Sequence, residues 1–304
     1  MLKEKLQINP EKIVSRLTLL IKDKMEKLKR DGVIFGLSGG VDSAIICALC
    51  VKAVGKEKCL GLIMPEEDSS KETRADAELT AKHFGVKTEF CDISSHLKLF
   101  GIYKLVPTRY LPRIFRDKAV RKFYGYYKQK TGESYFQSQL LGTKGYPYQE
   151  WLNKSQAYYR IKHRIRMVKM YYEAELRNLL CVSSANKTEW LTGLFVKWGI
   201  DGAGDVAPLL PFYKTQVRQL AEYLDVPQKI TGKAPSPDVM PGITDEYAMG
   251  IDYEKLDLIL VGLERKMSLP EIAKEVEVDE KIVDYVRELN RRSGHMREVY
   301  VPTL

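Results

Sequence analysis

The sequence predicts an α/β fold built on a doubly wound parallel sheet, and three observations support this prediction. Short apolar runs alternate along the chain with longer stretches of helical periodicity, which is the pattern of successive strand–helix units. The apolar runs are almost continuous, as expected for strands that are covered on both faces. A glycine-rich turn, Ser38–Ser43 (SGGVDS), follows the first run and precedes a helical stretch.

The first half of the chain shows these elements in order. A helix is predicted to begin at Asn9-Pro10, because asparagine suits the cap and proline the first turn. Apolar residues then recur at helical spacing as far as Leu28. Strands are predicted at 32–37, 59–64 and 87–93, with helices at 44–54 and 70–84.

The second half begins with a break in this rhythm. Residues 97–156 are rich in Tyr, Lys and Arg, and we interpret them as a central insertion with irregular or helical structure. A long amphipathic helix over Ala157–Leu180 and a fourth strand over Leu180–Ser183 follow. The chain 1–304 is therefore interpreted as one domain that carries an insertion.

The segment 253–304 is predicted to be helical. Ser268–Glu271 (SLPE) is a capping box that opens one of its helices. The stretch around this box resembles a helix–turn–helix, although small helical pairs of this pattern usually only pack against each other.

Composition favours a globular cytoplasmic protein. Hydrophobic residues make up 44% of the chain, and neither a secretory signal nor an apolar stretch of membrane-spanning length is visible. The odd number of five cysteines argues for a reducing compartment. Cys47 and Cys50 lie in an apolar helical run, so we interpret them as buried residues and not as metal ligands.

The net charge of +9 is concentrated in one segment. Residues 97–133 hold ten Lys and Arg against Asp117 and Glu133, a net of +8, so the rest of the chain is nearly neutral. Tyrosines interleave with these cations at positions 103, 110, 124, 126 and 127. This pattern can bind RNA by stacking and phosphate contacts. It is equally compatible with a cover over the active site, a partner interface, a membrane-surface patch or a solvated insertion.

The turn Gly36–Ser43 (GLSGGVDS) has the features of a phosphate-binding loop. Gly39 and Gly40 allow backbone N–H groups to approach a ligand closely, and the following helix adds its positive end. It is not a Walker loop, because the required lysine is absent. Asp42 is suited to hold Mg²⁺ on the bound phosphates.

Several segments together resemble the ammonia-dependent NAD synthase family of the PP-loop ATP pyrophosphatases. They are SGGVDS at 38–43, RIKHRIRM at 160–167, SSANKTEWLTGLF at 183–195, PFYKTQV at 211–217, PSPDVMPGITDEYAMG at 235–250, and His295 near the end of the chain. The resemblance implies an adenine nucleotide alpha-hydrolase-like sheet and a homodimer. It also implies that ATP, with Mg²⁺, activates deamido-NAD as an acyl-adenylate, which ammonia converts to NAD with release of AMP and pyrophosphate.

The resemblance also implies roles for individual residues. Lys214 would neutralise phosphate charge, Asp201 would capture ammonium or accept its proton, and Asp42 and Glu189 would hold Mg²⁺. The implied ATP-binding residues are Gly36, Leu37, Ser38, Gly39, Gly40, Val41, Asp42, Ser43, Ser184, Lys214 and Ser236. The implied deamido-NAD-binding residues are Arg164, Lys197, Asp205 and His295.

Three departures from the family lie in segments of the dinucleotide side. The loop after Lys197 is one residue longer, Ile243 replaces a frequent Gln, and Met296 replaces a Lys. Two other classes are therefore kept: a PP-loop enzyme that adenylates a different carboxylate or a tRNA base, and a non-catalytic nucleotide-binding relative. No segment resembles a glutaminase domain, so ammonia is expected from solution or from a separate partner.

Overall fold

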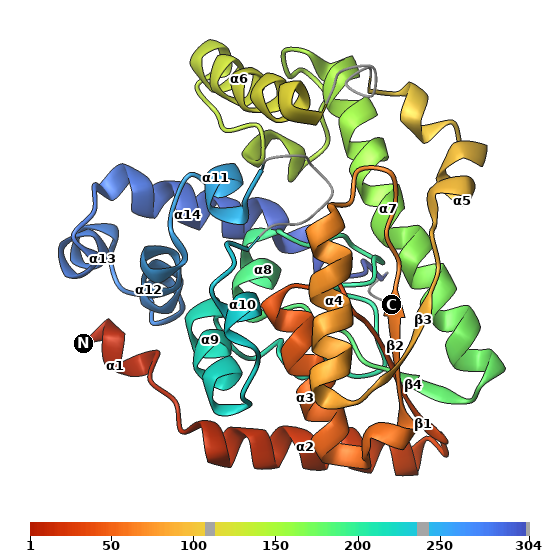
Figure 1. Cartoon of the computed structure of the whole chain (residues 1–304). Coiled ribbons are helices and arrows are strands. Elements are labelled where there is room, and N and C mark those ends of the chain that lie inside the picture. Colours follow the sequence, from red (N-terminus) through yellow and green to blue (C-terminus); the bar gives the residue numbers. More distant parts are fainter. Residues whose placement is uncertain (107–112, 236–242, 302–304) are drawn as a thin grey trace.

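A four-stranded parallel sheet forms the centre of the computed structural model, which describes residues 1–106, 113–235 and 243–301 (Figure 1). The strands are β1 (Gly32–Gly36), β2 (Cys59–Ile63), β3 (Lys87–Phe90) and β4 (Leu179–Cys181). Their order is β3-β2-β1-β4, and all neighbouring pairs are parallel. The predicted doubly wound α/β sheet is confirmed.

The strand order reverses at β1. In register, Val33 of β1 lies between Cys59 of β2 and Leu180 of β4. The chain moves outward from β1 through β2 to β3 and then returns to the other side of β1 with β4. Open α/β sheets bind their ligands at the carboxyl ends of strands where the order reverses, so the crevice between β1 and β4 is the expected site.

Helices cover both faces of the sheet, which explains the continuous apolar strands. Neighbours Ile34 and Phe35 are both fully buried but belong to different apolar clusters. Phe35 packs with α2 (Pro10–Lys27), α3 (Val41–Val54), α4 (Lys71–Phe84) and α9 (Lys214–Tyr223). Ile34 packs with α5 (Ser94–Leu99) and α7 (Gln149–Leu176).

Local signals determine several helix boundaries as predicted. The side chain of Asn9 accepts a hydrogen bond from the Lys12 amide at 3.0 Å, which confirms the cap of α2. Ser70 caps α4 in the same way, through the Thr73 amide at 2.9 Å. The Ser268 capping box also opens α13 as predicted.

Helix α7 differs from its prediction of Ala157–Leu180. It begins at Gln149, because Trp151 and Leu152 pack against the inserted segment. The first turns of the helix carry no apolar stripe of their own, so helical periodicity in the sequence does not reveal where the helix begins. It ends at Leu176, and Asn178 has a φ of +52°, which breaks the helix before β4. Its outer face exposes apolar residues, including Val168 and Tyr172.

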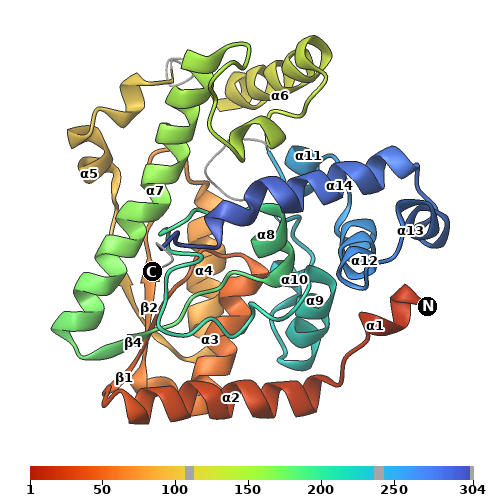
Figure 2. The same cartoon turned by 180° about the vertical axis from the view of Figure 1, so that it is seen from behind.

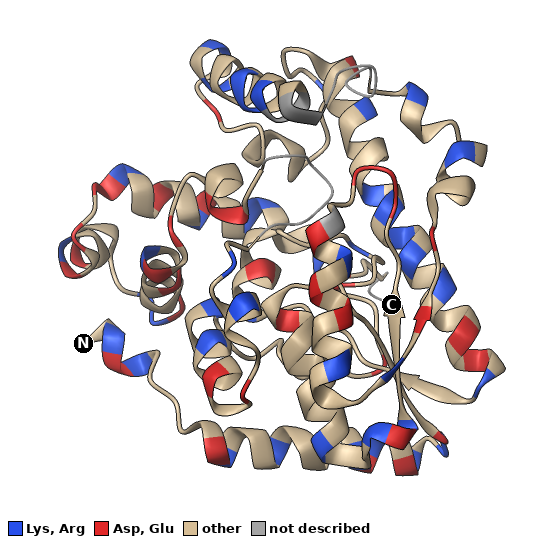
Figure 3. Ribbon diagram, viewed as in Figure 1, with Lys and Arg blue, Asp and Glu red and all other residues tan. Residues whose placement is uncertain are grey.

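The inserted segment forms α6 (Arg113–Thr131), which runs across the end of α7 (Figures 1 and 3). Tyr124 and Tyr127 are buried in a small aromatic cluster with Tyr135, and Tyr103 is buried beside α7. Those three tyrosines are therefore not available for stacking on RNA bases. Tyr126 is exposed, and Tyr110 lies outside the described residues. Tyr124 and Tyr127 are three residues apart, so they lie on the same face of the helix. The interleaved order of Tyr and Lys in the sequence does not reveal that this face is buried.

A second apolar cluster lies beside the sheet domain and includes the first residues of the chain (Figure 2). It is built from α12 (Tyr253–Glu264), α13 (Leu269–Val276), α14 (Glu280–Ser293) and α1 (Leu2–Lys5). Ile272 of α13 and Val283 of α14 are fully buried in this cluster, and these two helices are the pair whose sequence resembles a helix–turn–helix. The division of 1–304 into one domain, an insertion at 97–156 and a helical segment at 253–304 stays a prediction.

The remaining short elements connect these parts. They are α8 (Lys187–Thr192), α10 (Gln228–Thr231), α11 (Asp245–Met249) and the 3-10 turns η1 (Lys56–Lys58), η2 (Ile102–Lys104), η4 (Gln137–Gln139) and η5 (Gly294–Met296). Cys47 and Cys50 are fully buried in α3, as predicted. Within the described residues, no helix is both long and apolar enough to cross a membrane.

Candidate active site

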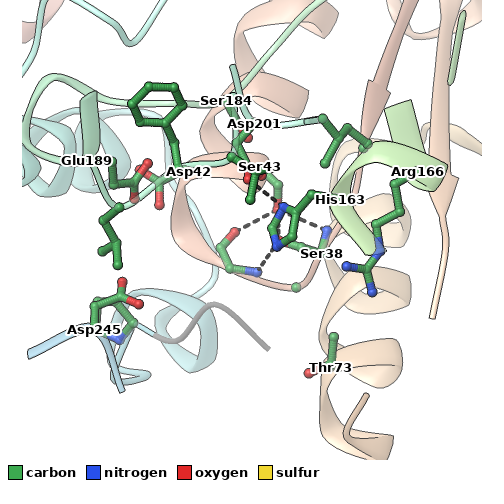
Figure 4. Close-up of a pocket in the computed structure, with 18 of the residues that line it drawn as sticks. Ser38, Asp42, Ser43, Thr73, His163, Arg166, Ser184, Glu189, Asp201 and Asp245 are labelled. Atoms are coloured by element: carbon green, nitrogen blue, oxygen red, sulfur yellow. Dashed lines mark hydrogen bonds and ion pairs between the residues drawn. The ribbon is translucent and has the colours of Figure 1, made fainter. Parts of the chain in front are cut away.

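A cavity of about 790 Å³ opens at the carboxyl ends of β1 and β4 (Figure 4). Its floor is the whole predicted phosphate loop, and α7, α8 and α9 contribute its walls. The predicted residues that line it are Gly36, Leu37, Ser38, Gly39, Gly40, Val41, Asp42, Ser43, Ser184, Glu189, Asp201 and Lys214. Ser236 lies outside the described residues.

The loop after β1 is closed by its own side chains. Ser43 Oγ accepts a hydrogen bond from the Ser38 amide at 3.3 Å and donates one to the Gly40 carbonyl at 2.9 Å. Ser38 Oγ accepts from the Gly40 amide at 3.3 Å. The helix that follows, α3, begins at Val41 and directs its positive end into the turn.

Gly39 is required where it stands. Its φ of +75° is a conformation that other residues rarely adopt, and a Cβ on it would lie 2.5 Å from the Thr73 carbonyl oxygen of α4. The backbone of the turn is therefore packed directly on a second helix. This arrangement gives a rigid concave backbone of the kind that binds phosphate.

Three charged side chains meet at the edge of this turn. Lys214 Nζ lies 2.5 Å from Asp42 Oδ2 and 3.3 Å from Glu189 Oε1. Burial by itself lowers the pKa of Lys214, but the two carboxylates outweigh this effect and raise it above its ordinary value. Burial raises the pKa of Glu189 to about 8, with Lys214 opposing the shift. The two acids that the sequence assigned to a metal are thus brought together.

The pair of acids fits Mg²⁺. In nucleotide sites this ion takes one or two carboxylates and completes its shell with water and phosphate oxygens. Asp42 and Glu189 supply two carboxylates that face one point, which Lys214 Nζ contacts. In the described part of the chain, no group of three or more His, Cys, Asp or Glu is arranged to hold a metal by protein ligands alone.

Buried hydrogen bonds determine where Glu189 and Lys214 lie. Asn186 caps α8 through the Glu189 amide at 3.0 Å, so Glu189 sits in the first turn of that helix. Asp257 of α12 accepts from Thr188 Oγ1 at 2.5 Å and from the Thr215 amide at 2.8 Å. The sequence analysis missed Asp257, although an acid inside the apolar run of α12 (LDLILV) is a signal that could have identified it.

Asp201 also lines the cavity and has a partner that the sequence analysis missed. His163 Nδ1 of α7 is 2.6 Å from Asp201 Oδ2. Burial raises the pKa of Asp201, but His163 and Arg166 outweigh it, so that the net pKa lies below the ordinary value. Arg166 also lines the cavity, and its Nε donates to the Met64 carbonyl at 2.9 Å.

Two further ionisable groups of the cavity were not predicted. Asp245 of α11 accepts a hydrogen bond from Tyr253 at 2.8 Å, and burial raises its pKa. Lys233 lines the cavity and is held by the buried Asp76 of α4 at 2.8 Å. Asp245 lies in the segment 235–250 that resembles the family, but the sequence analysis gave it no role, and Lys233 follows α10 without a recognisable motif.

The residues that the sequence assigned to deamido-NAD lie outside this cavity. Arg164 Nε donates to the Lys197 carbonyl at 3.3 Å, and Lys197 Nζ donates to the His295 carbonyl at 2.9 Å. His295 Nε2 lies 2.7 Å from the Leu140 carbonyl. These three residues form a contiguous group, whereas Asp205 accepts from the Cys181 amide at 2.9 Å and supports β4. Their assignment stays a prediction.

Comparisons with known proteins agree with this architecture. A model of the family described as NAD synthase matches residues 13–109 and 145–300. The NH(3)-dependent NAD(+) synthetase of Thermotoga maritima is 44% identical over 273 residues, covering 89% of this chain and 94% of that protein. The enzyme of the same name from Methanocaldococcus jannaschii is 35% identical, with 94% of each chain covered.

Solved structures share the fold. The NMN synthetase of Francisella tularensis has a TM-score of 0.70 at 24% identity and covers 98% of this chain and 99% of its own. An NH3-dependent NAD synthetase from Campylobacter jejuni has a TM-score of 0.68 at 22% identity, with 98% and 100% covered. The family match extends over both halves of the sheet and the helical tail, and leaves out 110–144, where α6 lies. The chain belongs to the NAD synthase family.

Proposed function

We propose that this protein joins ammonia to the carboxylate of deamido-NAD in an ATP-dependent reaction, forming NAD, AMP and pyrophosphate through an acyl-adenylate. The observation that carries the proposal is the meeting of Asp42, Glu189 and Lys214 at the edge of the glycine-rich turn. That arrangement suits a magnesium triphosphate. The relatives named NH(3)-dependent NAD(+) synthetase, at up to 44% identity, support the choice of nucleophile and product.

The first step needs the phosphates of ATP to be held and their charge neutralised. The backbone of Gly39 and Gly40 and the start of α3 offer N–H groups to the phosphate oxygens. Asp42 and Glu189 would hold Mg²⁺, which, when bound, withdraws negative charge from the phosphates. Lys214 lies within reach of the same point and balances the charge that grows on the leaving pyrophosphate. The substrate carboxylate then forms a bond to the α-phosphorus as the bond to pyrophosphate breaks.

In the second step ammonia forms a bond to the acyl carbon and AMP leaves. No protein nucleophile is needed, so positioning and charge stabilisation supply the catalysis. Asp201 is held ionised by its surroundings, since its pKa lies below the ordinary value. A partly buried carboxylate in that state attracts an ammonium ion into the cavity.

The group formed by Arg164, Lys197 and His295 supports a binding site for the dinucleotide. Within the described residues, neither Arg164 nor Lys197 has a carboxylate partner, so both cations remain available to phosphate. We include Asp205, which lies at the end of β4, in the same predicted site.

The outer face of α7 supports the expected homodimer. Val168, Tyr172 and Leu176 recur at intervals of four residues and are each more than half exposed, at 57%, 58% and 65%. An exposed apolar stripe on one helix is a typical subunit interface. We place the enzyme in the cytoplasm, where the five free cysteines would stay reduced. RNA or a protein partner at the basic face of α6 stays a prediction.

The test is a product assay with purified protein, ATP, Mg²⁺ and ammonium, and with deamido-NAD compared with other carboxylic acids. We expect AMP, pyrophosphate and NAD in equal amounts with deamido-NAD. Asp42→Asn should abolish all three products, and Asp23→Asn on the outside of α2 serves as the matched control. AMP formation with another acid but not with deamido-NAD would assign a different substrate, and ATP binding without turnover would indicate a non-catalytic relative.

A further inference from the structure

His163 is the one histidine on the cavity wall within the described residues, and nothing above gives it a role. It lies on α7 with its ring between Asp201 and the Ser38–Ser43 turn, and Arg166 lies further along the same helix (Figure 4). Its side chain is 12% exposed. A histidine that faces both a carboxylate and a substrate cavity has the surroundings of a proton-transfer group.

The backbone holds His163 against the loop that carries Asp201. The Ile200 amide donates to the His163 carbonyl at 3.2 Å. Gly199 allows this approach, because a Cβ at that position would lie 2.9 Å from the Cβ of His163. The loop and the helix are therefore in direct contact at this pair, and the distance of 2.6 Å between Nδ1 and Asp201 Oδ2 is a consequence of that packing.

The pairing determines which ring nitrogen is available. Nδ1 lies within hydrogen-bond distance of Asp201 Oδ2, but the angle does not make a hydrogen bond in this conformation. A small rotation of the ring would form it, which would favour the proton at Nδ1 and leave the free electron pair on Nε2. Nε2 has no hydrogen-bond partner among the residues that the structure describes. The ring thus lines the cavity and has the Asp201 carboxylate beside its Nδ1.

The second step of the proposed reaction creates a need for such an acceptor. When ammonia attacks the acyl carbon, the new C–N bond leaves a positive charge and a surplus proton on nitrogen. The adduct reverts to ammonia unless this proton is removed before the bond to AMP breaks. A positioned base typically accelerates such a transfer by about 10²–10⁴-fold.

We propose that His163 is the general base of the ammonia step, with Asp201 as the residue that orients and stabilises it. The inference rests on the proposed function. Nε2 accepts the proton from the nitrogen of the adduct, the electron pair of that N–H bond stays on nitrogen, and the C–O bond to AMP breaks with its pair leaving on the phosphate oxygen. The imidazolium then releases its proton to water, which restores the starting state.

Several other charged groups of the cavity lining are held by partners of their own. Arg166 contacts the Met64 carbonyl, and Lys214 is enclosed by Asp42 and Glu189. Asp245 is held by Tyr253. Asp68, which also lines the cavity, pairs with Lys162 at 2.7 Å. Asp201 is a weak proton acceptor because its pKa is lowered.

The experiment separates the two steps in His163→Gln and compares two nucleophiles. Pyrophosphate release from ATP and deamido-NAD, measured before any nucleophile is added, reports adenylation alone. Ammonia or hydroxylamine is then added and the amide or hydroxamate is measured. Hydroxylamine is a weaker base, so its adduct is more acidic and loses its proton to water without help.

We expect His163→Gln to release pyrophosphate at the wild-type rate, to lose about 10²-fold or more of its ammonia-dependent turnover, and to keep hydroxylamine-dependent turnover within a few fold. The matched control is His96→Gln on α5, an exposed histidine far from the cavity lining. His163→Asn, a second polar replacement without a basic nitrogen, should show the same selective loss and covers the case in which the first variant does not fold.

Two results would overturn the assignment. Equal losses with ammonia and hydroxylamine, or a parallel loss of pyrophosphate release, would make His163 a structural residue. Unchanged turnover with ammonia would remove it from the reaction. If wild-type protein releases no pyrophosphate with deamido-NAD, the proposed function itself fails, and that outcome is distinct from both.

Discussion

Replacing Asp257 with alanine should loosen the two helices that carry Glu189 and Lys214. Asp257 is fully buried on α12 and accepts hydrogen bonds from Thr188 Oγ1 of α8 at 2.5 Å and from the Thr215 amide of α9 at 2.8 Å. Alanine leaves the buried Thr188 hydroxyl and the half-buried Thr215 amide without this acceptor, at about 1–3 kcal/mol each. We therefore expect the free energy of unfolding to fall by about 2–6 kcal/mol.

The same carboxylate makes stability depend on pH. Burial raises the pKa of Asp257 from its ordinary value of 3.8 to about 6, although its hydrogen bonds oppose the shift. The folded state then binds this proton more tightly than the unfolded state does. The contribution of Asp257 to stability therefore increases as pH falls from 7 through 6 towards 4, by about 3 kcal/mol at most.

Urea unfolding followed by circular dichroism at pH 5 and pH 7 measures both effects. Asp257→Asn removes the titration but keeps a side chain of the same size, so its stability relative to wild type should improve on going from pH 5 to pH 7. Asp284→Asn, which loses only an exposed ion pair with Arg287, is the control and should change stability by less than about 1 kcal/mol. An unfolding free energy for Asp257→Ala within that range of wild type would refute the reasoning.

Three further outcomes follow from the site. Glu189→Gln should lower the rate of pyrophosphate release by about 10²–10³-fold and raise the Mg²⁺ concentration needed for half-maximal rate; an unchanged Mg²⁺ dependence would argue against its role as a ligand. Gly39→Ala should weaken ATP binding, measured by calorimetry, because the added Cβ meets the Thr73 carbonyl. Gly55→Ala is the control: Gly55 has a similar φ of +83°, but an added Cβ would have no neighbour within 4 Å, so ATP binding should stay intact. Arg292→Ala breaks the ion pair with Glu133 at 3.0 Å and should speed tryptic cleavage within α6; Arg287→Ala, an exposed pair, should not.

The inserted segment shows why a pattern of residue types is not sufficient. Its sequence suggested a basic, aromatic surface, but Tyr124 and Tyr127 point into a cluster shared with Tyr135 and Leu152. The cations Lys118, Arg121, Lys122, Lys128 and Lys130 of the same helix are exposed. The helical repeat places Tyr124 and Tyr127 on the buried face, whereas Tyr126 stays exposed beside Lys130, whose Nζ lies 5.9 Å from the centre of its ring.

The metal and phosphate residues were easier to predict than the base. Asp42 belongs to a local motif whose glycines, hydroxyls and following helix are contiguous, and the conformation of such a turn depends mainly on its own sequence. His163 and Asp201 lie 2.6 Å apart although a strand and α8 separate them in the chain. A pair of this kind is made by the packing of a loop on a helix, for which no short-range pattern exists.

The amino-acid sequence by itself determined the parallel strand–helix units, the closed turn after β1, the cysteines buried in α3 and the capped starts of α2, α4 and α13. Each of these features depends on apolar periodicity or on hydrogen bonds within a few residues. Only the tertiary structure decided which tyrosines of the insertion are buried, that Lys214 lies between Asp42 and Glu189, that Asp257 anchors their helices and that His163 meets Asp201. Those contacts join segments far apart in the chain, and their energies come from burial that exists only once the sheet and its helices have packed together.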